Sequence, residues 1–155
     1  MVINAIKRMF AHSFEKEWFE TYWAFDLHGT IIKPNYKKGD TSVEYYPFAK
    51  ETLQLLSKRA DIKMILWTSS YPEEIEHYIS QFEKDEIHFD AINKNPGISS
   101  KNGNFGYYDD KFYFNVLFED KAGFNPNEEW AQVYYYLLWC NDVNYMPNPE
   151  WTTKY

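Results

Sequence analysis

The chain has 155 residues, a formal net charge of −7, 45% apolar and 21% aromatic residues; this favours one domain (1–155) with a sizeable core. The negative charge disfavours non-specific binding to nucleic acid, although a local basic track would offset it. A single cysteine excludes an intramolecular disulfide and a cysteine-based metal cluster, no apolar run reaches membrane length, and a cytoplasmic protein without membrane contacts is therefore expected.

In the first half of the chain, helical and strand patterns alternate. Residues 2–20 carry apolar side chains at three- and four-residue spacings, which predicts an amphipathic helix that packs on the domain. A buried strand at 22–26 and a polar, turn-rich stretch follow, and a short strand is expected at 42–46. A helix is predicted at 47–59, and Ile62–Trp67 is predicted to be the next strand.

The same alternation continues in the second half. The expected elements are a helix at 72–82, a strand at 88–92, a glycine-containing loop at 93–110, a strand at 112–118 and a helix at 127–140, followed by an irregular tail. Strands that alternate with helices predict an α/β fold, a three-layer α/β/α Rossmann-like arrangement with a parallel sheet.

Three of the apolar runs end in residues that carry chemistry. They end in Asp26, in Thr68, and in the pair Glu119 and Asp120. Each of these residues has an ordinary explanation when it is taken alone, as a helix cap or a turn residue. Because parallel strands bring their carboxyl ends to one edge of a sheet, all four residues are expected to converge there.

The first of these stretches resembles the first motif of the haloacid dehalogenase-like (HAD) superfamily, in which apolar residues precede Asp-x-Asp-Gly-Thr. Asp26, Gly29 and Thr30 match that motif, and His28 replaces its second Asp. The resemblance implies that Asp26 is a phosphate-accepting nucleophile. It covers the core motifs at 22–124, whereas the N-terminal helix (1–20) and the C-terminal helix and tail (127–155) lie outside it.

Two further stretches carry the same resemblance. Residues 65–68 resemble the second motif, in which a Thr or Ser hydroxyl binds the transferring phosphoryl group, and this implies that role for Thr68. Residues 117–123 resemble the fourth motif, a strand that ends in paired acids. For the loosely placed lysine of the third motif, Lys111 is the better match and Lys94 the second choice; an ordinary surface lysine remains an equal alternative.

Three converging carboxylates call for a cation. At an effective dielectric near 20, two unit charges about 4 Å apart repel by roughly 4 kcal/mol. Oxygen ligands suit Mg²⁺, and the resemblance implies that it is held by Asp26, Glu119, Asp120 and the main-chain carbonyl of His28. The expected activity is Mg²⁺-dependent hydrolysis of a phosphoric monoester through an aspartyl-phosphate. The alternative is a weakened or inactive protein that binds a phosphorylated ligand or a protein partner.

The histidine leaves three readings open. In the family, the side chain at this position protonates the leaving group and later activates water. His28 either takes over this acid–base role, for which a pKa near 6.5 is suitable, or serves another task such as substrate contact, or marks a degenerate site.

The sequence has little room for a large cap domain. The interval from Asp26 to Thr68 and the interval from Thr68 to Lys111 are both filled by the elements described above, so the site should be open. Neither the phosphorylated substrate nor the oligomeric state follows from the sequence. The tyrosine and phenylalanine side chains of two loops either stack on a substrate ring or pack ordinarily; they are Tyr36, Tyr45, Tyr46, Phe105, Tyr107 and Tyr108.

Overall fold

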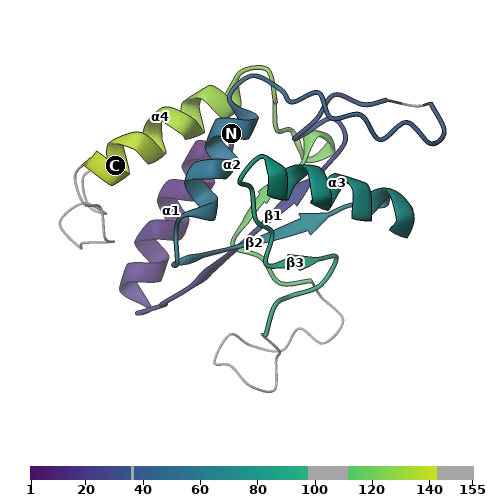
Figure 1. Cartoon of the computed structure of the whole chain (residues 1–155). Coiled ribbons are helices and arrows are strands. Elements are labelled where there is room, and N and C mark those ends of the chain that lie inside the picture. Colours follow the sequence, from purple (N-terminus) through teal and green to yellow (C-terminus); the bar gives the residue numbers. More distant parts are fainter. Residues whose placement is uncertain (36, 98–111, 143–155) are drawn as a thin grey trace.

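The computed structural model describes residues 1–35, 37–97 and 112–142 (Figure 1). In chain order its elements are α1 (Val2–Glu15), β1 (Thr21–Asp26), α2 (Ala49–Ser57), β2 (Ile62–Trp67), α3 (Pro72–Lys84), β3 (Ala91–Ile92), β4 (Val116–Phe118), the 3₁₀ helix η1 (Asp120–Ala122) and α4 (Glu129–Asp142). None of the described helices is both long and apolar enough to cross a membrane.

The four strands form one sheet in the order β3-β2-β1-β4, and all pairs are parallel. In the central strand β1, every residue from Thr21 to Phe25 is buried, as expected when helices cover both faces of a sheet. The predicted α/β class, with a three-layer Rossmann-like sheet, is therefore confirmed. No segment of the described residues forms a large cap domain.

The core beneath the carboxyl end of the sheet is a stack of aromatic rings. Phe25 lies 4.5 Å from Phe118, ring centre to ring centre, and Phe118 lies 5.1 Å from Trp130 at an interplanar angle of 11°. All three side chains are fully buried. The indole N–H of Trp130 also donates to the carbonyl of Thr30, at 2.8 Å. This hydrogen bond ties α4 to the turn that follows β1.

Three of the helices pack together. In Figure 1, α4 lies against both α1 and α2, and the C-terminal end of α3 meets α2, whose Lys50 and Gln54 side chains donate to Asp85. The buried carboxylate of Glu129, at the start of α4, accepts hydrogen bonds from the backbone N–H groups of Val2 and Asn125, each at 2.8 Å. The first turn of α1 is thereby fixed to the first turn of α4.

The N-terminal helix is shorter than the predicted 2–20, since α1 ends at Glu15. Glu17 has φ 54°, and the N–H of Trp18 donates to the carbonyl of Ser13 at 2.8 Å. This is the Schellman arrangement, in which a left-handed residue ends the helix and the chain turns back on itself. Glycine usually fills that position, so the glutamate gave no signal of a helix end.

The prediction of a strand at 42–46 is wrong. This stretch contributes only Tyr45, which forms an isolated antiparallel bridge with Ile32. The predicted strands at 88–92 and 112–118 shorten to β3 and β4. At their starts, the side chains of Asp90 and Asn115 accept hydrogen bonds from the N–H groups of Met64 and Tyr22, at 2.8 and 2.7 Å. A side chain therefore replaces the backbone acceptor where each ladder begins.

The helices predicted at 47–59, 72–82 and 127–140 are present as α2, α3 and α4, with ends shifted by two residues or less. The start of α2 moves to Ala49 because Phe48 has φ 65°, which lies outside helical geometry. Ile62–Trp67 coincides with its prediction.

Candidate active site

The three carboxylates predicted to converge do so at the carboxyl edge of the sheet. Asp26 ends β1, Glu119 follows β4, and Asp120 begins η1. One oxygen from each of the three side chains lies within 4.8 Å of the other two. All three residues are partly exposed, so a ligand can reach them from solvent.

The turn after β1 holds two of these acids in place. The hydroxyl of the fully buried Thr30 donates to Asp26 Oδ2 at 3.4 Å and accepts from the N–H of Asp120 at 3.0 Å. Gly29, with φ +85°, packs so closely on the other acid that a Cβ there would lie 2.9 Å from Asp120 Oδ2. The matched residues Gly29 and Thr30 thus position the carboxylates.

The pKa values of the acids record their crowding. Burial, together with the charge of Asp120, raises the pKa of Asp26, although the Leu27 N–H and Lys121 oppose this. Burial also raises the pKa of Glu119, as does its hydrogen bond with Asp120. The pKa of Asp120 is lowered, because its hydrogen bonds with Glu119 and Lys121 outweigh burial.

A lysine that was not predicted as the site cation lies beside the acids. Lys121 Nζ lies 3.2 Å from Asp120 Oδ1 and 3.6 Å from Glu119 Oε1. It also lowers the pKa of Asp26 through its charge. The side chain is 78% exposed, so it can change partner at little cost when an anion binds.

Thr68 follows β2 and is held by Asn93, which follows β3. The Thr68 N–H donates to Asn93 Oδ1, and Asn93 Nδ2 donates to the Thr68 carbonyl, both at 2.8 Å. Asn93 has φ 53°, a conformation that asparagine adopts more readily than most residues. The Thr68 hydroxyl accepts from the N–H of Ser70 at 3.2 Å and shares a second hydrogen bond, at 3.0 Å, with the Ser70 hydroxyl, in which either oxygen can donate.

Most of these groups share one pocket of about 480 Å³, although Asp120 is not among its described lining residues. Its described lining residues are Asp26, Trp67, Thr68, Ser69, Asn93, Glu119 and Lys121. The volume falls within the range of about 300–1,000 Å³ that is usual for small-molecule sites. The pocket therefore combines an acidic end, a lysine, a threonine hydroxyl and one large aromatic ring.

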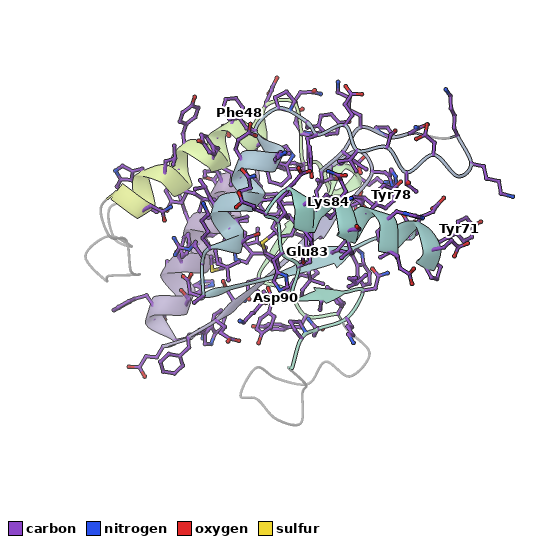
Figure 2. The ribbon with its side chains drawn as sticks, in the orientation of Figure 1. Phe48, Tyr71, Tyr78, Glu83, Lys84 and Asp90 are labelled. Atoms are coloured by element: carbon purple, nitrogen blue, oxygen red, sulfur yellow. The ribbon has the colours of Figure 1, made fainter. Side chains whose placement is uncertain are left out.

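His28 is directed elsewhere. Its Nε2 lies 3.0 Å from the hydroxyl of Tyr78, a buried residue of α3 that Figure 2 labels, and the two rings meet edge to face at 5.4 Å. Burial lowers the pKa of His28, and the charge of Glu74 opposes the shift. Among the described residues, His28 is not one that lines the acidic pocket.

The two predicted lysines have different outcomes. Lys111 lies outside the described residues. Lys94 is exposed and is not among the described lining residues of the pocket. Lys121 was overlooked as a site cation although it directly follows the paired acids, and Asn93 was overlooked although it ends an apolar run as Thr68 does. Extending the strand-end rule by one residue would have placed both residues near this edge of the sheet, but it would not have predicted which groups their side chains contact.

The aromatic loop residues that are described pack ordinarily. The Tyr45 hydroxyl donates to Asp85 at 2.7 Å, and both Tyr45 and Tyr46 pack against the core. The other four, which are Tyr36, Phe105, Tyr107 and Tyr108, lie outside the described residues.

No protein-family model and no curated protein matches this chain. One solved structure is similar, and it is described as that of the conserved protein coded by a locus from Bacteroides thetaiotaomicron. It has a TM-score of 0.57 and 24% sequence identity, and the alignment covers 77% of this chain and 90% of that one. At this identity, the similarity bears on the fold alone.

Proposed function

We propose that the chain is a Mg²⁺-dependent phosphoric monoester hydrolase of the HAD-like type, with Asp26 as the nucleophile. The observation that carries the proposal is the cluster in which Asp26, Glu119 and Asp120 bring oxygens to within 4.8 Å of one another, beside a pocket that Asp26 and Glu119 line. Thr68 and Lys121 line the same pocket. The fold similarity is neutral on this point, because it concerns the architecture only.

The donor set fits magnesium. Mg²⁺ binds oxygen ligands at about 2.0–2.1 Å, so ligand oxygens on opposite sides of the ion are about 4.2 Å apart. The three carboxylate oxygens lie within 4.8 Å, so small side-chain rotations suffice to bring them to one ion. The main-chain carbonyl of His28 is the proposed fourth protein ligand, and water and a phosphate oxygen complete the set. When bound, the ion neutralises the acids and the charge on the phosphate oxygens.

Asp26 is proposed to attack phosphorus. A bond forms between one of its carboxylate oxygens and phosphorus as the bond to the ester oxygen breaks, and the ester oxygen leaves as an alcohol after gaining a proton. Water then hydrolyses the aspartyl-phosphate to phosphate and regenerates the carboxylate. The reaction needs the ionised acid; burial and Asp120 raise the pKa of Asp26, and the Leu27 N–H and Lys121 oppose that rise.

Thr68 and Lys121 are proposed to bind the phosphoryl group. The Thr68 hydroxyl accepts from the Ser70 N–H; when the Ser70 hydroxyl is the donor in their mutual hydrogen bond, the Thr68 proton is available to a phosphate oxygen. Lys121 already bridges the two acids and can extend to a third oxygen of the substrate. The reciprocal hydrogen bonds of Asn93 fix the Thr68 backbone, and this prepares the hydroxyl for the phosphoryl group.

His28 is proposed as the acid–base residue, and its hydrogen bond with Tyr78 favours a second candidate function. If the ring stays on Tyr78, the site binds phosphate and metal without efficient proton transfer. General acid–base catalysis contributes roughly 10²–10⁴-fold, so such a protein would be a slow enzyme or a binding module for a phosphorylated ligand.

The test of the first proposal is hydrolysis of p-nitrophenyl phosphate and a panel of phosphomonoesters with Mg²⁺. Asp26→Asn should abolish turnover and leave the unfolding midpoint close to that of the wild type. Glu73→Gln, which removes an exposed acid of α3, is the matched control and should retain full activity. If the wild type turns over no phosphoester in the panel, the catalytic proposal fails.

His28→Asp separates the two candidate functions. Loss of activity would assign acid–base catalysis to the imidazole. A gain from a very low level would instead identify the natural protein as the binding module.

A further inference from the structure

The pocket has an aromatic side wall next to the proposed nucleophile. Trp67 is the last residue of β2 and pairs in register with Asp26, the last residue of β1. Neighbouring strands lie about 4.8 Å apart, and residues in register project to the same side of a sheet. Both residues line the same pocket.

The ring of Trp67 is supported but not covered. Phe112 stacks on it at a centroid distance of 4.3 Å and an interplanar angle of 30°. Even so, 39% of Trp67 is exposed, whereas Met64, Ile65 and Leu66 of the same strand are buried. When a ligand covers a large aromatic ring that is partly exposed to water, the burial of apolar surface stabilises the complex.

The position of the ring relative to Asp26 limits which ligands can reach it. In an in-line attack the ester oxygen lies on the far side of phosphorus from the carboxylate, so a ring one or two bonds beyond it lies a few ångströms out from the strand end. A tryptophan side chain that projects into the pocket from the neighbouring strand end can reach that far. In a nucleoside 5′-monophosphate the sugar separates the base from the phosphate, which carries the base farther away. The position next to Asp26 therefore favours a ring close to the ester.

We propose that Trp67 forms a binding wall for phosphate monoesters whose leaving group carries an aromatic ring close to the ester oxygen. This inference rests on the proposed phosphatase function and specifies its substrate class. Stacking on Trp67 stabilises the bound substrate and the transition state equally, so it lowers KM more than it raises kcat.

The test compares benzyl phosphate with cyclohexylmethyl phosphate. Both release a primary alcohol of similar size, so the ratio of their kcat/KM values reports on the aromatic ring more than on the leaving group. In the wild type this ratio should be about 2–13, the equivalent of the roughly 0.5–1.5 kcal/mol that an aromatic pair adds beyond its buried area. Trp67→Leu should lower the ratio toward one, and Trp67→Phe should retain most of it.

Phe114→Leu is the matched control. Phe114 is also 39% exposed and belongs to the same aromatic group, since its ring centre lies 6.2 Å from that of Phe112. It is not among the described lining residues of the pocket, so its replacement should leave the ratio unchanged. Adenosine 5′-monophosphate serves as a further substrate, and its kcat/KM should not depend on Trp67.

The outcomes distinguish the two proposals. Turnover of both esters with a wild-type ratio near one, or an unchanged ratio in Trp67→Leu, overturns the inference and leaves the phosphatase proposal in place. A Trp67-dependent preference for the nucleotide overturns the proposed distance between ring and phosphate. If no ester is turned over, the phosphatase proposal itself fails. Should Trp67→Leu not fold, the wild-type ratio and Trp67→Phe still test the inference.

Discussion

Replacing Gly29 with alanine perturbs the acidic cluster without altering any charged side chain. Gly29 has φ +85°, where an L-residue costs about 1–2 kcal/mol relative to glycine. The added Cβ would also lie 2.9 Å from Asp120 Oδ2 and 3.2 Å from its Cγ. Ordinary van der Waals separation is about 3.5 Å, so the carboxylate must move by roughly half an ångström, away from its place beside Asp26 and Glu119.

Gly39→Ala is the control for the backbone contribution. Gly39 has φ +79°, and no atom of the described chain lies within 4 Å of a Cβ built there. The backbone conformation alone should cost both variants about 1–2 kcal/mol of unfolding free energy in urea. Only Gly29→Ala should also lose Mg²⁺ affinity in isothermal titration calorimetry, by about 10–100-fold, as happens when the groups that orient metal ligands are disturbed. Equal Mg²⁺ affinity in the two variants would refute the role given to Gly29.

Three further predictions concern the supports of the site and of the fold. Asn93→Ala should lower kcat/KM about 10-fold or more by releasing Thr68, with little change in Mg²⁺ affinity in calorimetry. Mg²⁺ at about 100 times its dissociation constant should stabilise the protein by about 2.7 kcal/mol in urea unfolding, and a chelator should reverse this. The carboxylate of Asp85 accepts hydrogen bonds from Lys50 Nζ and from the Tyr45 hydroxyl, each at 2.7 Å. Burial raises the pKa of Asp85, but these hydrogen bonds outweigh it and lower the pKa below the ordinary 3.8. Ionised Asp85 therefore stabilises the fold above pH 3.8, the ordinary pKa of the group. This stabilisation is lost as the pH falls through the lower pKa of the folded state. Asp85→Asn should be destabilised by about 1.5–3 kcal/mol at pH 7, and its difference from wild type in urea unfolding should shrink below pH 3.8.

The position of the acids could be predicted because it depends on the backbone alone. Once β1 and β4 are recognised as parallel neighbours, their register fixes where Asp26 and Glu119 emerge. Buried strands of this kind are recognised by their apolar runs, such as residues 64–67 in β2. The convergence at one edge therefore follows without knowledge of any side-chain conformation.

What could not be predicted depends on side chains that take over backbone roles. Asp90 and Asn115 accept strand hydrogen bonds at the starts of β3 and β4, and Asn93 pairs with Thr68 at the end of β3. In the sequence these residue types are typical of turns. Lys121 is similar: its long side chain determines which acid it contacts, and its place in the chain does not.

His28 is the residue for which sequence and structure suggest different chemistry. The ordinary imidazole pKa of 6.5 suits both halves of an acid–base cycle at neutral pH, whereas burial in this fold lowers the pKa of His28. A lowered pKa favours the neutral ring, which can activate water but is a poor proton donor to a leaving group.

The consequence can be measured with two substrates. The protonated ring exists only below the lowered pKa, so kcat/KM for an alkyl phosphate, whose leaving group needs a proton, should fall as the pH rises through that value. The same parameter for p-nitrophenyl phosphate, whose leaving group needs none, should stay level. His28→Gln should lose the slope with the alkyl ester, and Tyr78→Phe should retain it, because the hydrogen bond with Tyr78 orients the ring without supplying the proton. An identical slope in His28→Gln would mean that another group donates the proton, and the imidazole would then have no part in leaving-group departure.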